Sequence, residues 1–127
     1  SGVASGATHI AFFGSSAYSS YPVVGASGAI FQVISALCLL LPLKITFLLV
    51  IPMPAALVGI ILAAVELYAT KYWMYGPVFI AHHAHLGGFV FGGVYSFIVE
   101  PKQAIKGLIV AVVFLVAIYI LSLWLIF

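Results

Sequence analysis

Two residues in separate apolar segments of this chain have the chemical types needed for acyl transfer. Ser27 lies in the stretch Gly25-Ala26-Ser27-Gly28, and His85 lies in a later apolar segment. A neutral histidine can take the proton of a serine hydroxyl as the oxygen attacks a carbonyl carbon, and can return that proton to the leaving group. The two residues therefore predict nucleophilic catalysis, provided that their segments are helices lying side by side.

The position of Ser27 also offers a donor for the oxyanion that forms during such an attack. We expect Ser27 in the first turn of its helix. A backbone N–H in the first turn has no intrahelical acceptor, and the N-terminus of a helix carries positive potential. The backbone N–H of Ser27 is therefore a candidate oxyanion donor, in addition to the role of the hydroxyl as nucleophile.

Small and aromatic residues near the pair favour close packing of the two helices. His85, Gly88 and Gly92 have the spacing i, i+3, i+7 and share one helical face. Glycines on such a face let a second backbone approach closely. Phe31 follows Ser27 by one turn, so its ring should pack beside the imidazole. The residues expected to support the site are Gly25, Gly28, Phe31, Gly88 and Gly92.

The composition of the chain indicates which solvent surrounds it. Of its 127 residues, 66% are hydrophobic and 5% are charged, whereas soluble domains carry roughly 25% charged residues. The lipid bilayer is therefore the expected solvent, and the chain should be an integral, multi-pass protein, with the cell membrane as the expected location. The net charge of +2 is too small to indicate nucleic acid binding.

Polar and proline-containing turns divide the chain into apolar segments. Small residues at 1–13 indicate the end of a helix, and a loop rich in Gly, Ser and Pro follows at 14–22. Complete spans are predicted at 24–41, 45–68, 78–99 and 107–127. Pro52 and Pro54 should bend the second span near one end. The predicted fold is an all-α, polytopic bundle of membrane helices.

Lysines between the spans indicate how the chain is oriented. Lys44, Lys102 and Lys106 fall on one side of the predicted bundle, and Lys71 falls on the other. The positive-inside bias places the first three in the cytoplasm. The candidate serine and histidine then lie near the outward ends of their helices, and the active site should face outside. Because the histidine is deeper in its helix, the serine helix should begin below the membrane surface, beside a water-filled cavity.

These motifs resemble those of the rhomboid intramembrane serine proteases. Residues 25–28 match the GxSG nucleophile motif of that family, and residues 85–92 match its HxxGxxxG helix, in the same order and in separate spans. The resemblance covers roughly residues 1–100 and is carried by both motifs together. It implies that Ser27 is the nucleophile and His85 the base of a dyad without an acid. It also implies cleavage of transmembrane segments of other membrane proteins, without a cofactor.

The resemblance implies a division of the chain as well. Residues 1–100 would form the C-terminal part of a rhomboid catalytic core, and residues 101–127 an extra C-terminal transmembrane helix. Rhomboids take further oxyanion donors, a histidine and an asparagine, from an earlier helix that these residues lack. We therefore expect the missing N-terminal helices of the same protein to be needed to complete the site, and little activity from residues 1–127 alone.

Other interpretations of the polar residues compete with this one. The run His82-His83-Ala84-His85 suggests a metal site, but it lacks carboxylate or thiol partners and the HExxH spacing, so no metal is expected. Glu66 is expected at the membrane interface near the outer end of its span. A non-catalytic rhomboid-like protein that binds transmembrane clients is the alternative function. Such relatives tend to lack the serine and the histidine, which favours the enzyme.

Overall fold

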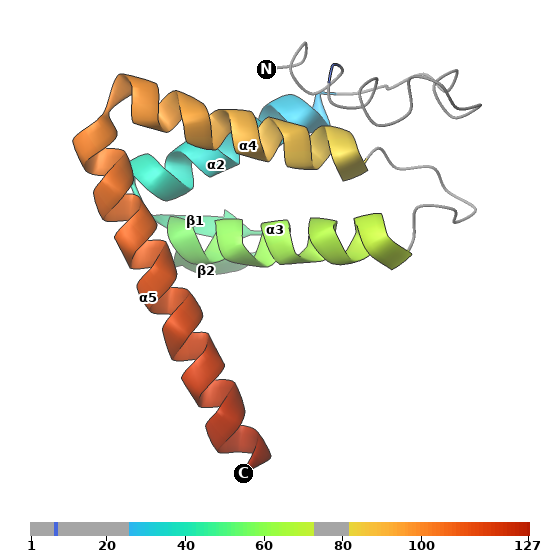
Figure 1. Cartoon of the computed structure of the whole chain (residues 1–127), viewed down its shortest axis with the longest axis vertical. Coiled ribbons are helices and arrows are strands. Elements are labelled where there is room, and N and C mark those ends of the chain that lie inside the picture. The colour runs from blue at the N-terminus through green and yellow to red at the C-terminus, as the bar shows by residue number, and fades with distance from the viewer. Residues whose placement is uncertain (1–6, 8–25, 73–81) are drawn as a thin grey trace.

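The computed structural model describes residue 7 and residues 26–72 and 82–127, which are mainly helical (Figure 1). The elements in chain order are α2 (Ser27–Leu40), β1 (Ile45–Leu48), β2 (Ile51–Pro54), α3 (Ala55–Tyr72), α4 (His82–Val99) and α5 (Pro101–Ile126). The predicted helical architecture is confirmed, with one small hairpin between α2 and α3.

The helices differ in their capacity to cross a membrane. Among the described residues, α3 and α5 are long and apolar enough to do so, and α2 is a shorter apolar helix of 14 residues. At about 1.5 Å per residue, α2 is roughly 21 Å long, less than the ~30 Å of a hydrocarbon core. A helix of this length placed across a bilayer would have at least one end below the membrane surface, and the low start of α2 stays a prediction.

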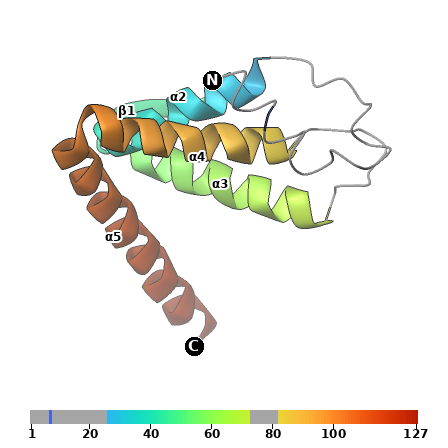
Figure 2. The ribbon, with the colours of Figure 1, turned by 45° about the horizontal axis from the view of Figure 1, so that its top comes forward.

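Helices α2 and α4 lie side by side and run in the same direction (Figures 1 and 2). A Cβ atom at Gly88 would lie 2.1 Å from the carbonyl oxygen of Gly28, and one at Gly92 would lie 2.2 Å from that of Gln32. Because both contacts advance by one turn on each helix, the two helices are parallel. No side chain larger than hydrogen fits at these two positions, which confirms the predicted glycine face.

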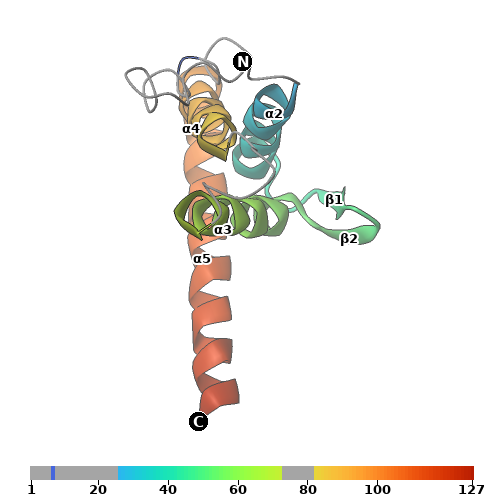
Figure 3. The ribbon, with the colours of Figure 1, turned by 90° about the vertical axis from the view of Figure 1, so that its right-hand side faces the viewer.

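Helix α3 packs below this pair in the opposite direction (Figure 3). Near its start, the close approach of Gly59 to Cys38 ties α3 to the later part of α2, since a Cβ at Gly59 would lie 2.3 Å from Cys38 Sγ. The Cys38 thiol donates a hydrogen bond of 2.8 Å to the carbonyl oxygen of Ala55. The later half of α3 therefore lies along the first turns of α4.

The segment before α3 is a β-hairpin and not the first part of a membrane span, so that part of the prediction is wrong. Strands β1 and β2 pair antiparallel, with Leu48 opposite Ile51. Leu49, in the turn, has a φ of 58°, as the primed hairpin turns require. Pro52 and Pro54 lack the N–H that a helix needs and disfavour helical geometry in the residue before them. They exclude the helix from this segment, and α3 begins directly after Pro54.

Helix α5 leaves the bundle at an angle and extends away from it (Figures 1 and 3). It begins at Pro101, earlier than the predicted residue 107, because proline fits the first turn of a helix. The Gln103 side chain donates a hydrogen bond of 3.0 Å to the carbonyl oxygen of Leu40. Gly107 packs against the backbone of Leu39. These contacts place the start of α5 at the end of α2.

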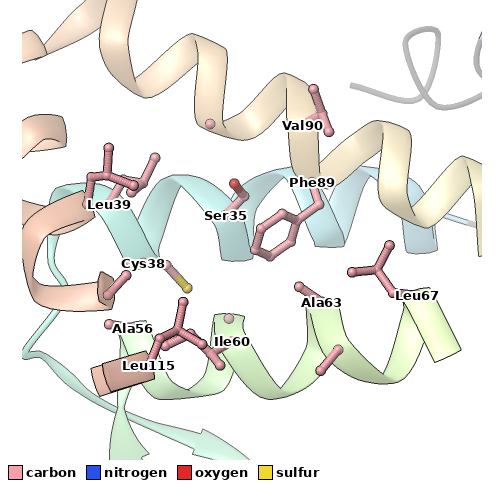
Figure 4. A pocket seen from close by; sticks show the side chains of 15 residues that line it. Ser35, Cys38, Leu39, Ala56, Ile60, Ala63, Leu67, Phe89, Val90 and Leu115 are labelled. Carbon is pink, nitrogen blue, oxygen red and sulfur yellow. The ribbon is translucent and has the colours of Figure 1, made fainter. Parts of the chain in front are cut away.

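An apolar pocket of about 480 Å³ opens between α2, α3, α4 and α5 (Figure 4). Its walls include Ala63 and Leu67 of α3, Phe89 of α4 and Leu115 of α5. The pocket lining contains neither candidate catalytic residue. The pocket is therefore separate from the site of Ser27 and His85.

Candidate active site

The predicted nucleophile and base lie at the adjoining first turns of α2 and α4. Ser27 is the first residue of α2, and His85 belongs to the first turn of α4. Ser27 Oγ lies 2.8 Å from His85 Nε2, and the contact is partly buried. Because α2 and α4 are parallel and begin at the same end of the bundle, residues far apart in the chain come within hydrogen-bond distance.

An aromatic ring holds the plane of the imidazole. The rings of Phe31 and His85 are stacked, with centroids 4.6 Å apart and planes 7° from parallel. The expected packing of Phe31 beside the imidazole is confirmed. Gly28 and Gly88 permit the close backbone approach that this arrangement needs. Gly25, also expected to support the site, lies outside the described residues.

The start of α2 leaves backbone donors near the serine. The N–H of Ile30 donates to the carbonyl oxygen of Ala26 at 3.0 Å, which is the first turn of this helix. The N–H of Ser27 comes before that bond and has no acceptor within the helix. It also lies in the positive potential of the helix N-terminus. Its use as an oxyanion donor stays a prediction, and the helix geometry suits that use.

A third side chain, Glu66 of α3, reaches the pair. Glu66 Oε1 lies 3.0 Å from His85 Nδ1, on the side of the ring opposite the serine contact. Glu66 is only 7% exposed, so its carboxylate is buried between the helices, while its expected place at the membrane interface stays a prediction. The sequence does contain a signal that could have identified Glu66 as a site residue, because an ionisable residue inside an apolar span is a functional candidate by default.

His82 completes the cluster one turn before His85. Its Nδ1 lies 2.5 Å from Glu66 Oε2, and its ring stands nearly perpendicular to the His85 ring, with centroids 6.0 Å apart. His82 and His83 are both buried. The expectation that the histidine run lacks a carboxylate partner is wrong, because that partner comes from another helix.

The same three residues include the donor types that a metal ion would need. One ligand atom from each of Glu66, His82 and His85 lies within 4.8 Å of the others. In this structure, however, each carboxylate oxygen pairs with one imidazole, and the remaining nitrogen of His85 faces Ser27. The geometry is that of a hydrogen-bonded chain leading to a serine. The absence of a metal role stays a prediction.

Comparison with known families gives one match. The sequence model of the Rhomboid domain family matches residues 1–102, a range that includes Ser27, Glu66 and His85. No curated protein and no solved structure gives a significant match to this chain.

Proposed function

The chain belongs to the rhomboid family, and from this premise we propose that it is an intramembrane serine protease acting through Ser27 and His85. The family includes intramembrane proteases and inactive relatives. The observation that carries the proposal is the distance of 2.8 Å between Ser27 Oγ and His85 Nε2. A protein that only binds transmembrane clients has no need for a serine hydroxyl held against an imidazole nitrogen.

The proposed reaction uses each group in a defined role. His85 Nε2 accepts the hydroxyl proton while Ser27 Oγ attacks the carbonyl carbon of the scissile peptide bond. The backbone N–H of Ser27 donates to the oxyanion that forms. The protonated His85 then gives its proton to the leaving amine, and an acyl-enzyme remains on Ser27. Water, activated by the same imidazole, hydrolyses this ester and restores the serine.

The substrates we propose are transmembrane segments of other membrane proteins. The surface of α5 is largely apolar and exposed, and the α3 and α5 helices suit a bilayer. We place the protein in the cell membrane as a multi-pass protein. Lys44 and Lys102 lie at the end of the bundle away from the site. The positive-inside bias therefore supports a site that faces outside. Further oxyanion donors would come from N-terminal helices of the same protein.

Labelling with a serine-reactive fluorophosphonate tests the proposal. In membranes that contain the intact protein, the probe should bond covalently to Ser27, because His85 activates that hydroxyl. Mass spectrometry of the labelled peptide identifies the modified residue. Ser27→Ala should remove the label, and His85→Ala should reduce it strongly. An unlabelled wild-type protein, or equal labelling of Ser27→Ala, would contradict the enzyme and favour the non-catalytic client-binding alternative.

A further inference from the structure

A continuous chain of polar contacts runs from the serine through two helices. Ser27 Oγ meets His85 Nε2 at 2.8 Å, His85 Nδ1 meets Glu66 Oε1 at 3.0 Å, and Glu66 Oε2 meets His82 Nδ1 at 2.5 Å. The ionisable side chains involved are about nine-tenths buried, with the Glu66 side chain 10% exposed and that of His85 12% exposed. The contacts join α2, α4 and α3, so their order does not follow the order of the chain.

The two nitrogens of His85 must have different proton states for the proposed chemistry. Nε2 can accept the serine proton only if it carries no hydrogen, and a neutral imidazole then carries its hydrogen on Nδ1. That Nδ1–H points at Glu66 Oε1. Since an ionised carboxylate only accepts hydrogen bonds, it selects this tautomer. The same negative charge stabilises the imidazolium that forms when His85 takes the serine proton.

His82 holds the carboxylate in place from its other side. A glutamate has a flexible stem, and one imidazole contact would leave the second oxygen free to turn. The bond from His82 Nδ1 to Glu66 Oε2 occupies that oxygen. A buried carboxylate in a membrane span is costly unless it is paired. Only two acidic residues occur in the chain, Glu66 and Glu100, and one of them lies at this position.

From these contacts we propose that Glu66 is a positioning residue that extends the serine and histidine into a Ser27–His85–Glu66 relay, with His82 as its outer support. The inference rests on the proposed protease function and deepens it, because a dyad without an acid is what the family resemblance implies. The alternative is that Glu66 and His82 simply tie α3 to α4. The two roles differ in what happens to the proton of His85.

Kinetics of Glu66→Gln in the intact, membrane-embedded protein test the relay. In the amide, an NH2 donor replaces one of the two oxygens, so the side chain can no longer present an acceptor to both Nδ1–H groups in the present geometry. We expect kcat and the rate of Ser27 labelling to fall about 10²- to 10⁴-fold, with little change in KM. Glu100→Gln, which removes the same charge at the exposed α4–α5 turn, is the matched control and should leave both values unchanged. Thermal unfolding of each variant shows whether it is folded.

A second measurement does not depend on activity. In protein labelled with ¹⁵N-histidine, the imidazole nitrogen shifts report which ring nitrogen of His85 carries the proton. The Nδ1–H form should dominate in the wild type, and the Nε2–H form should appear in Glu66→Gln. The signals that disappear in the His85→Asn variant are those of the His85 imidazole.

The outcomes separate the two proposals. A folded Glu66→Gln variant with wild-type kcat, or one in which His85 keeps the Nδ1–H form, would overturn the relay while Ser27 labelling still supported the protease. An unlabelled Ser27 with a tautomer that responds to Glu66 would overturn the protease and leave the positioning role of Glu66 intact.

Discussion

His85 is contacted on three sides, and each contact fixes a different property of the ring. Nε2 faces the hydroxyl of Ser27, Nδ1 faces the carboxylate of Glu66, and one ring face lies on Phe31. Under the proposed mechanism, the first contact sets where the proton arrives, the second sets which nitrogen is free to receive it, and the third sets the plane of the ring. A general base must lie within hydrogen-bond reach of the proton that it takes, and the contact with Ser27 meets this requirement.

The stacking contact can be tested apart from the polar ones. Phe31→Leu keeps an apolar side chain but removes the parallel ring at 4.6 Å from the imidazole. Aromatic pairs contribute about 0.5–1.5 kcal/mol beyond burial, so the rate of Ser27 labelling should fall about 2- to 12-fold. Wild-type labelling in Phe31→Leu would show that Ser27 and Glu66 alone hold the ring.

At the scale of the elements, one close contact between the parallel helices α2 and α4 holds Ser27 and His85 together. Gly28 and Gly88 bring the backbones of α2 and α4 together directly beside the Ser27–His85 contact. Wider spacing at this point would move the hydroxyl away from the imidazole, because Ser27 is next to Gly28 on α2 and His85 lies one turn before Gly88 on α4. Packing here therefore determines the geometry of the chemistry as well as the stability of the fold.

Two glycine-to-alanine substitutions on α4 distinguish the effect of the close helix contact from the effect of adding a methyl group to the helix. Gly88→Ala would place a Cβ 2.1 Å from the Gly28 carbonyl oxygen, so the helices must separate. We expect the free energy of unfolding to fall by about 1–3 kcal/mol, and Ser27 labelling to fall with it. Gly93→Ala is the matched control, because its Cβ would meet Ser35 Oγ at an ordinary 3.6 Å. Equal stability of the two variants in detergent would contradict the role of the Gly88 contact.

Sequence patterns predicted those parts of the site that depend on local spacing. Ser27 and Phe31 are one helical turn apart, and His85 and Gly88 share a face, so their relations follow from helix periodicity. Glu66 could not be placed in the same way, because its contacts with α4 depend on how α3 packs, and no short motif encodes that. The β1–β2 hairpin was missed because an apolar run with prolines fits either a bent span or a pair of strands.

At the scale of the whole molecule, two lysines lie at the end of the bundle opposite the candidate site. Lys44 follows α2, and Lys102 begins α5 beside the end of α2, whereas Ser27 begins α2. Lys71 lies in the last turn of α3, at the same end as the first turn of α4. The positions of Lys44, Lys102 and Lys71 therefore agree with the two sides of the bundle that the sequence predicts for them. Which group faces the cytoplasm is the part of the proposal that needs measurement.

Cysteine accessibility in intact cells measures that orientation. In a Cys38→Ala background, a membrane-impermeant maleimide added outside should label Lys71→Cys and leave Lys44→Cys and Lys102→Cys unlabelled. The positive-inside bias is the reason for this expectation. All three cysteines should react after the membrane is permeabilised, which controls for burial. Outside labelling of Lys44→Cys would reverse the proposed orientation.

The order of the elements has a consequence for the biogenesis of the protein. The serine lies on α2, its proposed carboxylate support on α3 and its base on α4, and these helices leave the ribosome in that order. Until α4 has entered the membrane and packed against α2, Ser27 lacks the imidazole of His85, and under the proposed mechanism its hydroxyl then has no base to activate it. Under the proposed function, a partly synthesised or prematurely terminated chain is therefore unable to cut its neighbours. The proposed activity therefore has to wait until α4 is inserted.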